Sequence, residues 1–141
     1  ITMKNKYYVF TFVILIIVMG CDQYDGKLTL VNNSNDTIYY SLSFDNNSIS
    51  SFPINQKEGK DNYEEANVIL PKSEIHETTM DTWEEFINTR FKDSTLLVFF
   101  FTDQLIKVAG RDSIMRNQLY SKKVTLKVKD LEKLNWRVIY Q

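Results

Sequence analysis

Six consecutive apolar residues, from Leu96 to Phe101, constrain the fold of this chain more than any other stretch. Successive side chains of a β-strand point to opposite faces of a sheet, so a strand of this composition needs apolar cover on both faces. Left exposed, the same window would be the most aggregation-prone part of the chain. The run therefore predicts the central strand of a sheet.

Residues 37–44 alternate between polar and apolar side chains, as a half-buried strand does. The alternation predicts that Tyr40 faces the core and that Tyr39 faces the opposite way. A strand beginning at Leu28 precedes this segment across a turn rich in Asn and Ser, which predicts an antiparallel hairpin. Residues 45–66 have no periodicity and are predicted to form a long polar loop.

Further short strands and helices are expected in the second half of the chain. Strands are predicted at 67–70, 73–79, 122–129 and 136–140. Three short helices are predicted from their N-terminal caps: one capped by Asp81 with Glu84, one that begins at Asp112 or Ser113 and ends at Tyr120, and one capped by Asp130. Residues 28–141 are therefore predicted to form a single mainly β domain of the β-rich α+β class. An antiparallel sheet or sandwich-like arrangement of six or seven strands, with two or three short helices, is expected.

The first twenty residues have the pattern of a secretory signal. Lys4 and Lys6 precede an uncharged, mostly apolar run from Tyr7 to Gly20. At about 1.5 Å per residue, a helix of this run falls well short of the roughly 30 Å hydrocarbon core of a bilayer. The pattern favours a signal peptide over residues 1–20 rather than a helix that spans the membrane.

The end of this signal resembles the lipobox of bacterial lipoproteins, in the residues Val18-Met19-Gly20-Cys21. The resemblance implies cleavage between Gly20 and Cys21, a diacylglyceryl group on the Cys21 thiol and acylation of the freed amino group. Two or more acyl chains give a stable membrane anchor. Because Cys21 is the only cysteine, its lipidation leaves no thiol for a disulfide or for catalysis within one chain. Residues 21–27 are then a lipidated polar tether.

Charge and motifs narrow the function classes. The chain has 17 basic and 18 acidic residues, and without residues 1–20 the numbers are 15 and 18, a net charge of −3, so nucleic acid is not an expected partner. The sequence contains no nucleophile elbow, phosphate-binding glycine loop or dinucleotide fingerprint. A non-catalytic binding or structural module is the expectation. The alternative is a small envelope hydrolase with two carboxylates brought together by folding.

Few side chains are candidates for binding. Tyr39 is the candidate for an exposed contact with a protein or glycan partner, because it faces away from the predicted core. His76, the only histidine, is interpreted as an exposed strand residue, since metal sites need three or four converging ligands. The acidic residues of the 45–66 loop match no calcium-binding spacing. No metal or other cofactor is therefore expected.

Several short segments resemble a group of small, uncharacterised lipoproteins of Bacteroidota. The segments are Val31-Asn32-Asn33-Ser34 with the aromatic strand after it, Trp83 with Phe86, the 96–101 run, and the closing DLEKLNWRVIY of residues 130–140. The resemblance implies a β-rich domain held at a membrane, and it brings no catalytic residues. Asp22 and Asp25, soon after Cys21, resemble the surface-export signal of such lipoproteins. Asp22 directly after Cys21 also resembles the inner-membrane retention signal of enterobacteria, which leaves the inner membrane as an alternative. The outer membrane, with the domain on its surface or its periplasmic face, is the expected location.

Overall fold

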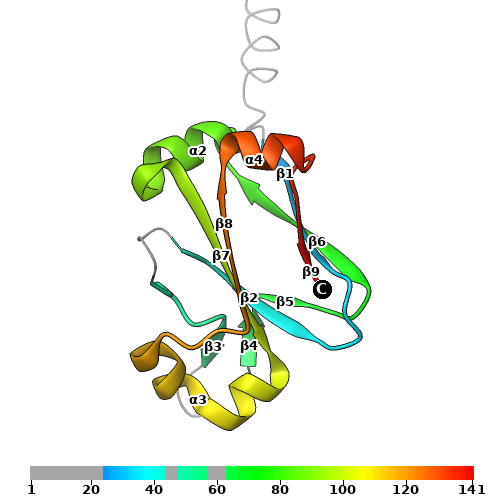
Figure 1. The fold of residues 1–141 in the computed structure, drawn as a ribbon, viewed down its shortest axis with the longest axis vertical. Helices are drawn as coiled ribbons and strands as arrows, with labels where there is room; N and C mark the ends of the chain where they lie inside the picture. Colours follow the sequence, from blue (N-terminus) through cyan, green and yellow to red (C-terminus); the bar gives the residue numbers. More distant parts are fainter. Residues whose placement is uncertain (1–23, 44–47, 57–62) are drawn as a thin grey trace, which may run out of the picture.

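The apolar run lies inside the larger of two sheets. The structure, a computed structural model, describes residues 24–43, 48–56 and 63–141. Strand β7 (Thr95–Thr102) lies between β2 (Ile38–Ser43) and β8 (Lys122–Lys127), and β5 (Val68–Ile69) completes an antiparallel sheet in the order β5-β2-β7-β8 (Figure 1). Every side chain of the run is at most 4% exposed. The predicted central strand is confirmed, and β8 lies at one edge of this sheet.

A second sheet places β1 (Asp25–Asn32) between β6 (Ser73–Thr79) and β9 (Arg137–Tyr140). Strand β1 runs antiparallel to β6 and parallel to β9. The predicted hairpin of β1 with β2 is therefore wrong, because the turn between them carries the chain from one sheet to the other. Alternation predicts which face of a strand is buried, but it does not specify the neighbouring strand.

The main hydrophobic core fills the space between the two sheets. Even-numbered side chains of β1, β2, β7 and β8 meet there, and Tyr40 is among them with 5% of its surface exposed, as predicted. The buried members of this core are Leu28, Leu30, Ile38, Tyr40, Ile69, Trp83, Ile87, Phe91, Leu96, Val98, Phe100, Leu126, Leu131, Trp136 and Val138. Two sheets facing one another across a core give the sandwich-like form of the predicted β-rich α+β class, which is confirmed.

Three helices and a short 3₁₀ turn accompany the sheets. They are α2 (Trp83–Arg90), the 3₁₀ turn Lys92–Ser94, α3 (Asp103–Asn117) and α4 (Val128–Lys133). Helices α2 and α4 lie together at one end of the molecule, and α3 lies at the other end (Figure 1). Helix α3 covers the second face of the larger sheet, where Leu97, Phe99 and Phe101 pack with Ile49 and Ile114. This second core explains why β7 is apolar on both faces.

Two helices begin at caps other than the predicted ones. Thr82, rather than Asp81, caps α2, because its hydroxyl accepts a hydrogen bond from the Glu85 N–H at 3.2 Å. Asp130 lies within α4, and its carboxylate accepts a hydrogen bond from the Lys127 N–H at 3.1 Å. Val128, predicted as part of a strand, therefore belongs to α4.

Helix α3 differs most from the prediction. It begins at Asp103, well before Asp112 or Ser113, and it ends at Asn117 rather than at Tyr120. The Thr102 hydroxyl caps it by accepting a hydrogen bond from the Leu105 N–H at 3.2 Å. Gly110 interrupts the helix with a φ of 69°, a conformation that glycine adopts without the steric cost of a Cβ atom.

The first strand and the long loop also differ from the prediction. Strand β1 begins at Asp25 rather than at Leu28, so residues 25–27 belong to the sheet and not to a tether. The region predicted as a loop contains β3 (Ile54–Gln56) paired with β4 (Tyr63–Ala66). The described residues thus contain nine strands rather than six or seven. Among these residues, no helix is both long and apolar enough to cross a membrane.

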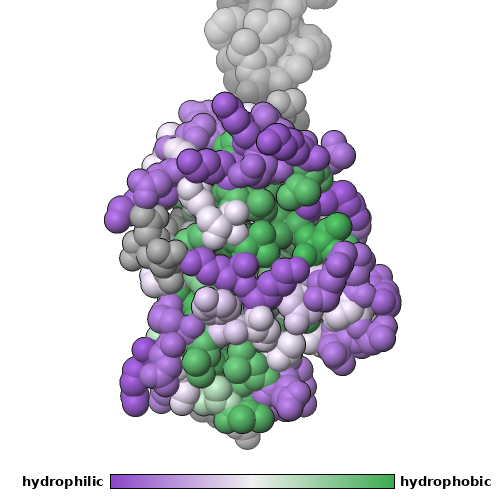
Figure 2. Space-filling view, in the orientation of Figure 1, coloured by the Kyte–Doolittle hydropathy of each residue, from purple (hydrophilic) through white to green (hydrophobic). Residues whose placement is uncertain are grey.

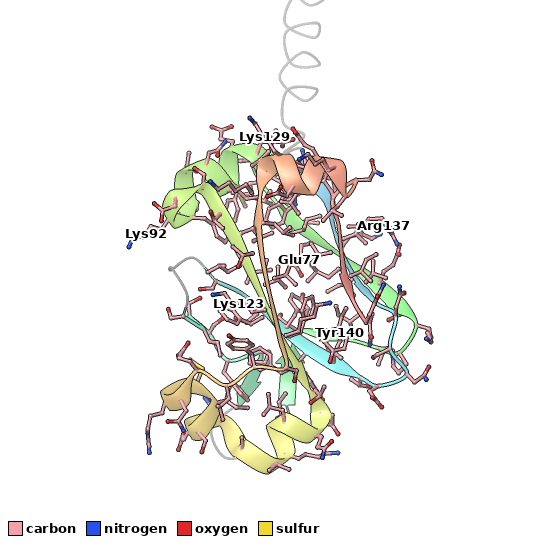
Figure 3. All side chains as sticks on the ribbon, in the orientation of Figure 1. Glu77, Lys92, Lys123, Lys129, Arg137 and Tyr140 are labelled. Atoms are coloured by element: carbon pink, nitrogen blue, oxygen red, sulfur yellow. The ribbon has the colours of Figure 1, made fainter. Side chains whose placement is uncertain are left out.

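A hydrogen bond joins the two sheets through the core. The Tyr40 hydroxyl of β2 donates to the carboxylate of Glu77 in β6, and Glu77 lies between the sheets in Figure 3. The Trp83 Nε1–H of α2 donates to the backbone oxygen of the same Glu77 at 3.2 Å. Burial, together with the hydrogen bond to Glu77, raises the pKa of Tyr40 well above its ordinary value of 10.0.

This raised pKa predicts a loss of stability in alkaline solution. The unfolded chain releases the Tyr40 proton near pH 10, whereas the folded protein keeps it. The contribution of Tyr40 to stability is therefore complete below about pH 10 and falls above it by up to about 1.4 kcal/mol per pH unit. Urea unfolding between about pH 8 and about pH 11 measures this slope. Tyr40→Phe removes the titrating group and is expected to flatten the slope by that amount, and equal slopes in the two proteins would contradict the prediction.

Candidate functional site

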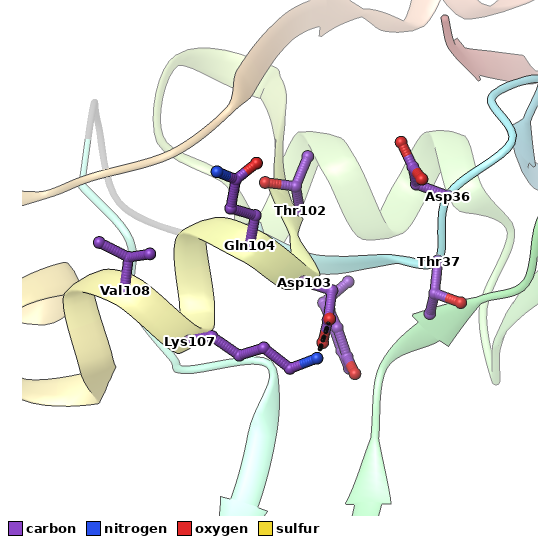
Figure 4. Close-up of a pocket in the computed structure, with 8 residues that line it drawn as sticks. Asp36, Thr37, Thr102, Asp103, Gln104, Lys107 and Val108 are labelled. Carbon is purple, nitrogen blue, oxygen red and sulfur yellow. Dashed lines mark ion pairs between the residues drawn. The ribbon is translucent and has the colours of Figure 1, made fainter.

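A hollow of about 660 Å³ lies beside the start of α3 (Figure 4). It is open to solvent and lies toward the end of the molecule remote from α2 and α4. Two segments that are distant in sequence form it, namely the turn between β1 and β2 with the start of β2, and the junction of β7 with α3. We name it the α3 hollow, and its lining residues are Asp36, Thr37, Tyr39, Thr102, Asp103, Gln104, Lys107 and Val108.

Local structure fixes both walls of the α3 hollow. On one side, the backbone oxygen of Asp36 accepts a hydrogen bond from the buried amide of Asn32 at 2.7 Å, and its N–H donates to the Ser34 hydroxyl at 3.2 Å. On the other side, Thr102 ends β7 and caps α3, so the helix begins where an inner strand of the larger sheet ends. The wall positions are therefore set by hydrogen-bonded backbone.

The charges in the α3 hollow nearly cancel. The ammonium of Lys107 lies 2.5 Å from the carboxylate of Asp103, one helical turn earlier, and this hydrogen bond raises the pKa of Lys107. With Asp36, the lining carries a formal charge of −1. Hydroxyl, amide, carboxylate and ammonium groups thus share a small concave surface without a strong field of either sign.

Tyr39 is the site residue that the sequence proposed, and it lies in this hollow. It faces away from the main core, as predicted, but it is only partly exposed because its strand neighbour in β7 is Phe101 and the second core packs against it. The other lining residues were missed because the fold alone brings the 36–37 turn beside α3. A usable signal was present in Thr102, whose position before Leu105, Ile106 and Ala109 is typical of an N-cap before an amphipathic turn.

A second polar cluster covers the outer face of the smaller sheet. Arg137 of β9 donates to Glu74 of β6 at 2.6 Å, and the His76 Nδ1 lies 3.1 Å from the Thr29 hydroxyl of β1. The hydrogen bond from Arg137 holds the pKa of Glu74 below its ordinary value. His76 is an exposed strand residue, as interpreted from the sequence, and its Nε2 is 3.9 Å from Glu74, too far for a hydrogen bond.

Thr29, His76 and Glu74 follow one another in the order of a catalytic nucleophile, base and acid. The Thr29 side chain would be the nucleophile, but Thr29 is 4% exposed and its hydroxyl contacts the Lys27 backbone oxygen at 3.3 Å. A substrate could not reach a hydroxyl buried in the middle strand of a sheet. The cluster is therefore best described as a cross-strand polar ladder that stabilises β6, β1 and β9.

The predicted lipidation site and the acidic residues of the 45–66 region, which were not expected to bind calcium, lie partly outside the described residues. Gly20 and Cys21 are outside them, as are Glu58 and Asp61, while Glu64 and Glu65 belong to β4. Within the described ranges, no three His, Cys, Asp or Glu side chains are placed to hold a metal ion.

The fold and the site define a β-rich α+β domain with a nearly neutral polar hollow at one end. Comparison of the chain with protein-family models, with curated proteins and with solved structures finds no match. Function is therefore inferred from the residues and their geometry.

Proposed function

We propose that this protein is a cell-envelope lipoprotein, acylated at Cys21, whose β-rich domain is a non-catalytic binding module. In this proposal the α3 hollow is the binding surface, and it faces away from the membrane. The observation that carries the proposal is the position of the chain's entry into the fold. Strand β1 starts at Asp25, four residues after Cys21, at the α2 and α4 end of the molecule (Figure 1).

Ionic contacts hold this entry point rigidly. Lys27 pairs with Asp25 at 3.1 Å and also with Glu84 of α2, and its ammonium lies 4.3 Å from the centre of the Trp136 ring. The Asp25 carboxylate also accepts a hydrogen bond from the Trp83 N–H at 2.9 Å, at the start of α2. Partial burial opposes the charged form of Asp25, but these hydrogen bonds outweigh it and lower its pKa.

The short connection favours a defined orientation. Residues 21–24 span at most about 14 Å when fully extended, so a lipid on Cys21 would hold the α2 and α4 end close to the membrane. Figure 2 shows mainly hydrophilic residues over these two helices, which suits contact with polar head groups. Lipid, rather than apolar protein surface, would then provide the attachment. The α3 hollow would be turned toward the space where a partner is met.

Acylation can be tested by metabolic labelling. Cells grown with an alkyne analogue of palmitate are expected to incorporate the label into this protein, because the Cys21 amino group is freed by cleavage after Gly20. Cys21→Ala removes the thiol that begins the modification and should abolish labelling while the protein is still produced. Intact mass should show a chain that starts at an acylated Cys21. An unlabelled wild-type protein with the mass of the unprocessed chain would refute the proposal.

Protease treatment of intact cells can then determine which face carries the domain. A C-terminal tag is expected to be lost from intact cells while a periplasmic control protein survives, which would place the domain on the cell surface. Loss of the tag only after lysis would instead place the domain on the periplasmic face.

One observation favours a second function, a carboxylate-dependent hydrolase. Asp36 and Asp103 both line the α3 hollow, and glycosidases use two carboxylates across the bond that is cleaved. However, Asp103 is already engaged in an ion pair with Lys107 at 2.5 Å, so the two carboxylates do not form a free pair. Binding is therefore the function that the geometry supports better.

A further inference from the structure

We infer that the α3 hollow binds an uncharged, hydroxyl-rich chain, that is, a segment of a neutral oligosaccharide. The inference rests on the proposed function in taking this hollow as the binding surface, and it adds the chemical class of the ligand and the path along which it lies. Four observations carry it: the mixture of polar groups, the near-zero charge, a second hollow that continues the first, and an aromatic ring beside each hollow.

The polar groups suit adjacent hydroxyls, each of which can donate and accept a hydrogen bond. Acceptors are available in the carboxylates of Asp36 and Asp103, and donors in Lys107 and the amide of Gln104. Thr37 can serve as either. A volume of about 660 Å³ lies within the roughly 300–1,000 Å³ range of small-ligand sites, and its open shape suits part of a chain better than an enclosed small molecule.

The charge distribution disfavours ionic ligands. A polyanion would meet two carboxylates against one ammonium, and that ammonium is already paired with Asp103 at 2.5 Å. A cation would have only the single carboxylate of Asp36 outside this pair. Because hydrogen bonds to charged groups are stronger than those between neutral groups, a neutral polyhydroxylated ligand still gains affinity from these side chains.

A second, shallower hollow of about 390 Å³ extends the first along the other side of α3. It shares Thr102, Gln104 and Val108 with the α3 hollow, and its remaining lining residues are Leu105, Tyr120 and Ser121. We name it the Tyr120 hollow. Val108, 81% exposed, lies between the two hollows, and apolar surface is visible over α3 in Figure 2. A ligand that fills both must therefore be elongated.

An aromatic ring borders each hollow. Tyr39 packs against the second core, and the ring of Tyr120 contacts Phe99 edge-on, with centroids 5.3 Å apart. Both rings are held by buried neighbours, so little side-chain entropy is lost when a ligand packs on them. Sugar rings have apolar C–H faces beside their hydroxyls, which matches aromatic walls combined with hydrogen-bonding groups.

The test is titration of the purified full-length protein in detergent micelles with neutral hexasaccharides of glucose, mannose, xylose and galactose, and with polygalacturonate as a polyanion. At least one neutral hexasaccharide is expected to bind, more tightly than its disaccharide because the longer chain reaches the Tyr120 hollow. Tyr39→Ala is expected to weaken binding at least tenfold. Gln104→Ala, on the helix surface, should weaken it severalfold without disturbing the cores.

Matched variants complete the design. Tyr24→Ala replaces an exposed tyrosine at the opposite end of the molecule and should leave affinity unchanged. Tyr120→Ala should weaken hexasaccharide binding and leave disaccharide binding nearly unchanged. Failure of every neutral hexasaccharide to bind would overturn the inference. So would binding that survives both Tyr39→Ala and Gln104→Ala, or preferential binding of polygalacturonate that Lys107→Ala abolishes.

The inferred ligand class and the proposed function can fail separately. If the protein is acylated but binds no neutral oligosaccharide, the proposed membrane anchor is supported and the inferred ligand class is refuted. Saccharide binding by a protein that is never acylated supports the ligand class and refutes the anchor. Shortening of the hexasaccharide that is lost in Asp36→Asn would support the ligand class and overturn the non-catalytic function in favour of the hydrolase.

Discussion

Replacing Asn32 with alanine is expected to lower the free energy of unfolding by about 3 kcal/mol, because its buried side chain connects three segments. Its surface is 0% exposed. Its amide nitrogen donates to the backbone oxygens of Asp36 at 2.7 Å and of Ile69 and Leu70 at 3.1 Å. Its amide oxygen accepts from the Ser34 N–H at 2.9 Å and from the Ser34 hydroxyl at 2.7 Å. Truncation would remove all of these hydrogen bonds, including the fully buried one to the Ile69 oxygen, and urea unfolding measures the loss.

Two further variants sharpen this prediction. Asn33→Ala changes the neighbouring exposed residue, whose hydrogen bonds with Tyr140 and Lys72 involve its backbone, and should alter stability by no more than about 0.5 kcal/mol. Asn32→Asp keeps the shape and the acceptor for Ser34, but places a carboxylate against three carbonyl oxygens. It should be at least as destabilising as alanine. An Asn32→Ala protein as stable as Asn33→Ala would show that the connection contributes little.

The same substitution also bears on the candidate site. Asn32 fixes the Asp36 backbone, which forms one wall of the α3 hollow. Asn32→Ala is therefore expected to weaken ligand binding even under conditions in which the protein remains folded. The Asn32-Asn33-Ser34 segment is one of those that resemble small Bacteroidota lipoproteins. In this fold its role is structural, because the Asn32 side chain holds the turn before β2 and the end of β5.

Trp83→Ala is expected to destabilise the protein by about 4 kcal/mol, the largest effect predicted for a single side chain here. Trp83 is 1% exposed and begins α2. Its ring packs edge-on against Phe86 with centroids 5.5 Å apart, and its Nε1–H donates to the Glu77 backbone oxygen at 3.2 Å. Removing the ring leaves a cavity between α2 and the main core. Urea unfolding followed by far-UV circular dichroism measures the change.

Trp83→Phe separates the contributions of packing and hydrogen bonding. It keeps an aromatic ring in the core and removes the donor to Glu77, so a smaller loss of about 1–2 kcal/mol is expected. Met80→Ala, at a side chain that is 72% exposed near the same helix, should change stability by less than about 0.5 kcal/mol. A Trp83→Ala protein that loses no more stability than Met80→Ala would contradict the assigned role of Trp83 in the core.

The sequence determined the features that depend on side-chain direction along one segment. The 96–101 run lies inside a sheet with both faces covered, and Tyr40 faces the core, as predicted. Trp83 and Ile87, one helical turn apart in α2, are both buried. These predictions succeeded because the repeat of each element decides which side chains share a face. Alternate side chains share a face of a strand, and side chains three or four residues apart share a face of a helix, whichever element packs against them.

Tertiary structure alone decided which segments meet. Strand β1 pairs with β6 and with the distant β9, rather than with β2. The sequence did not predict these partners, because backbone hydrogen bonds between strands carry no sequence signature. The α3 hollow depends on this topology, since the turn beside β1 and the cap of α3 come together only after both sheets have formed. By itself, the sequence predicted Tyr39 as a contact residue. The side chains that surround it follow from long-range packing, which no local pattern encodes.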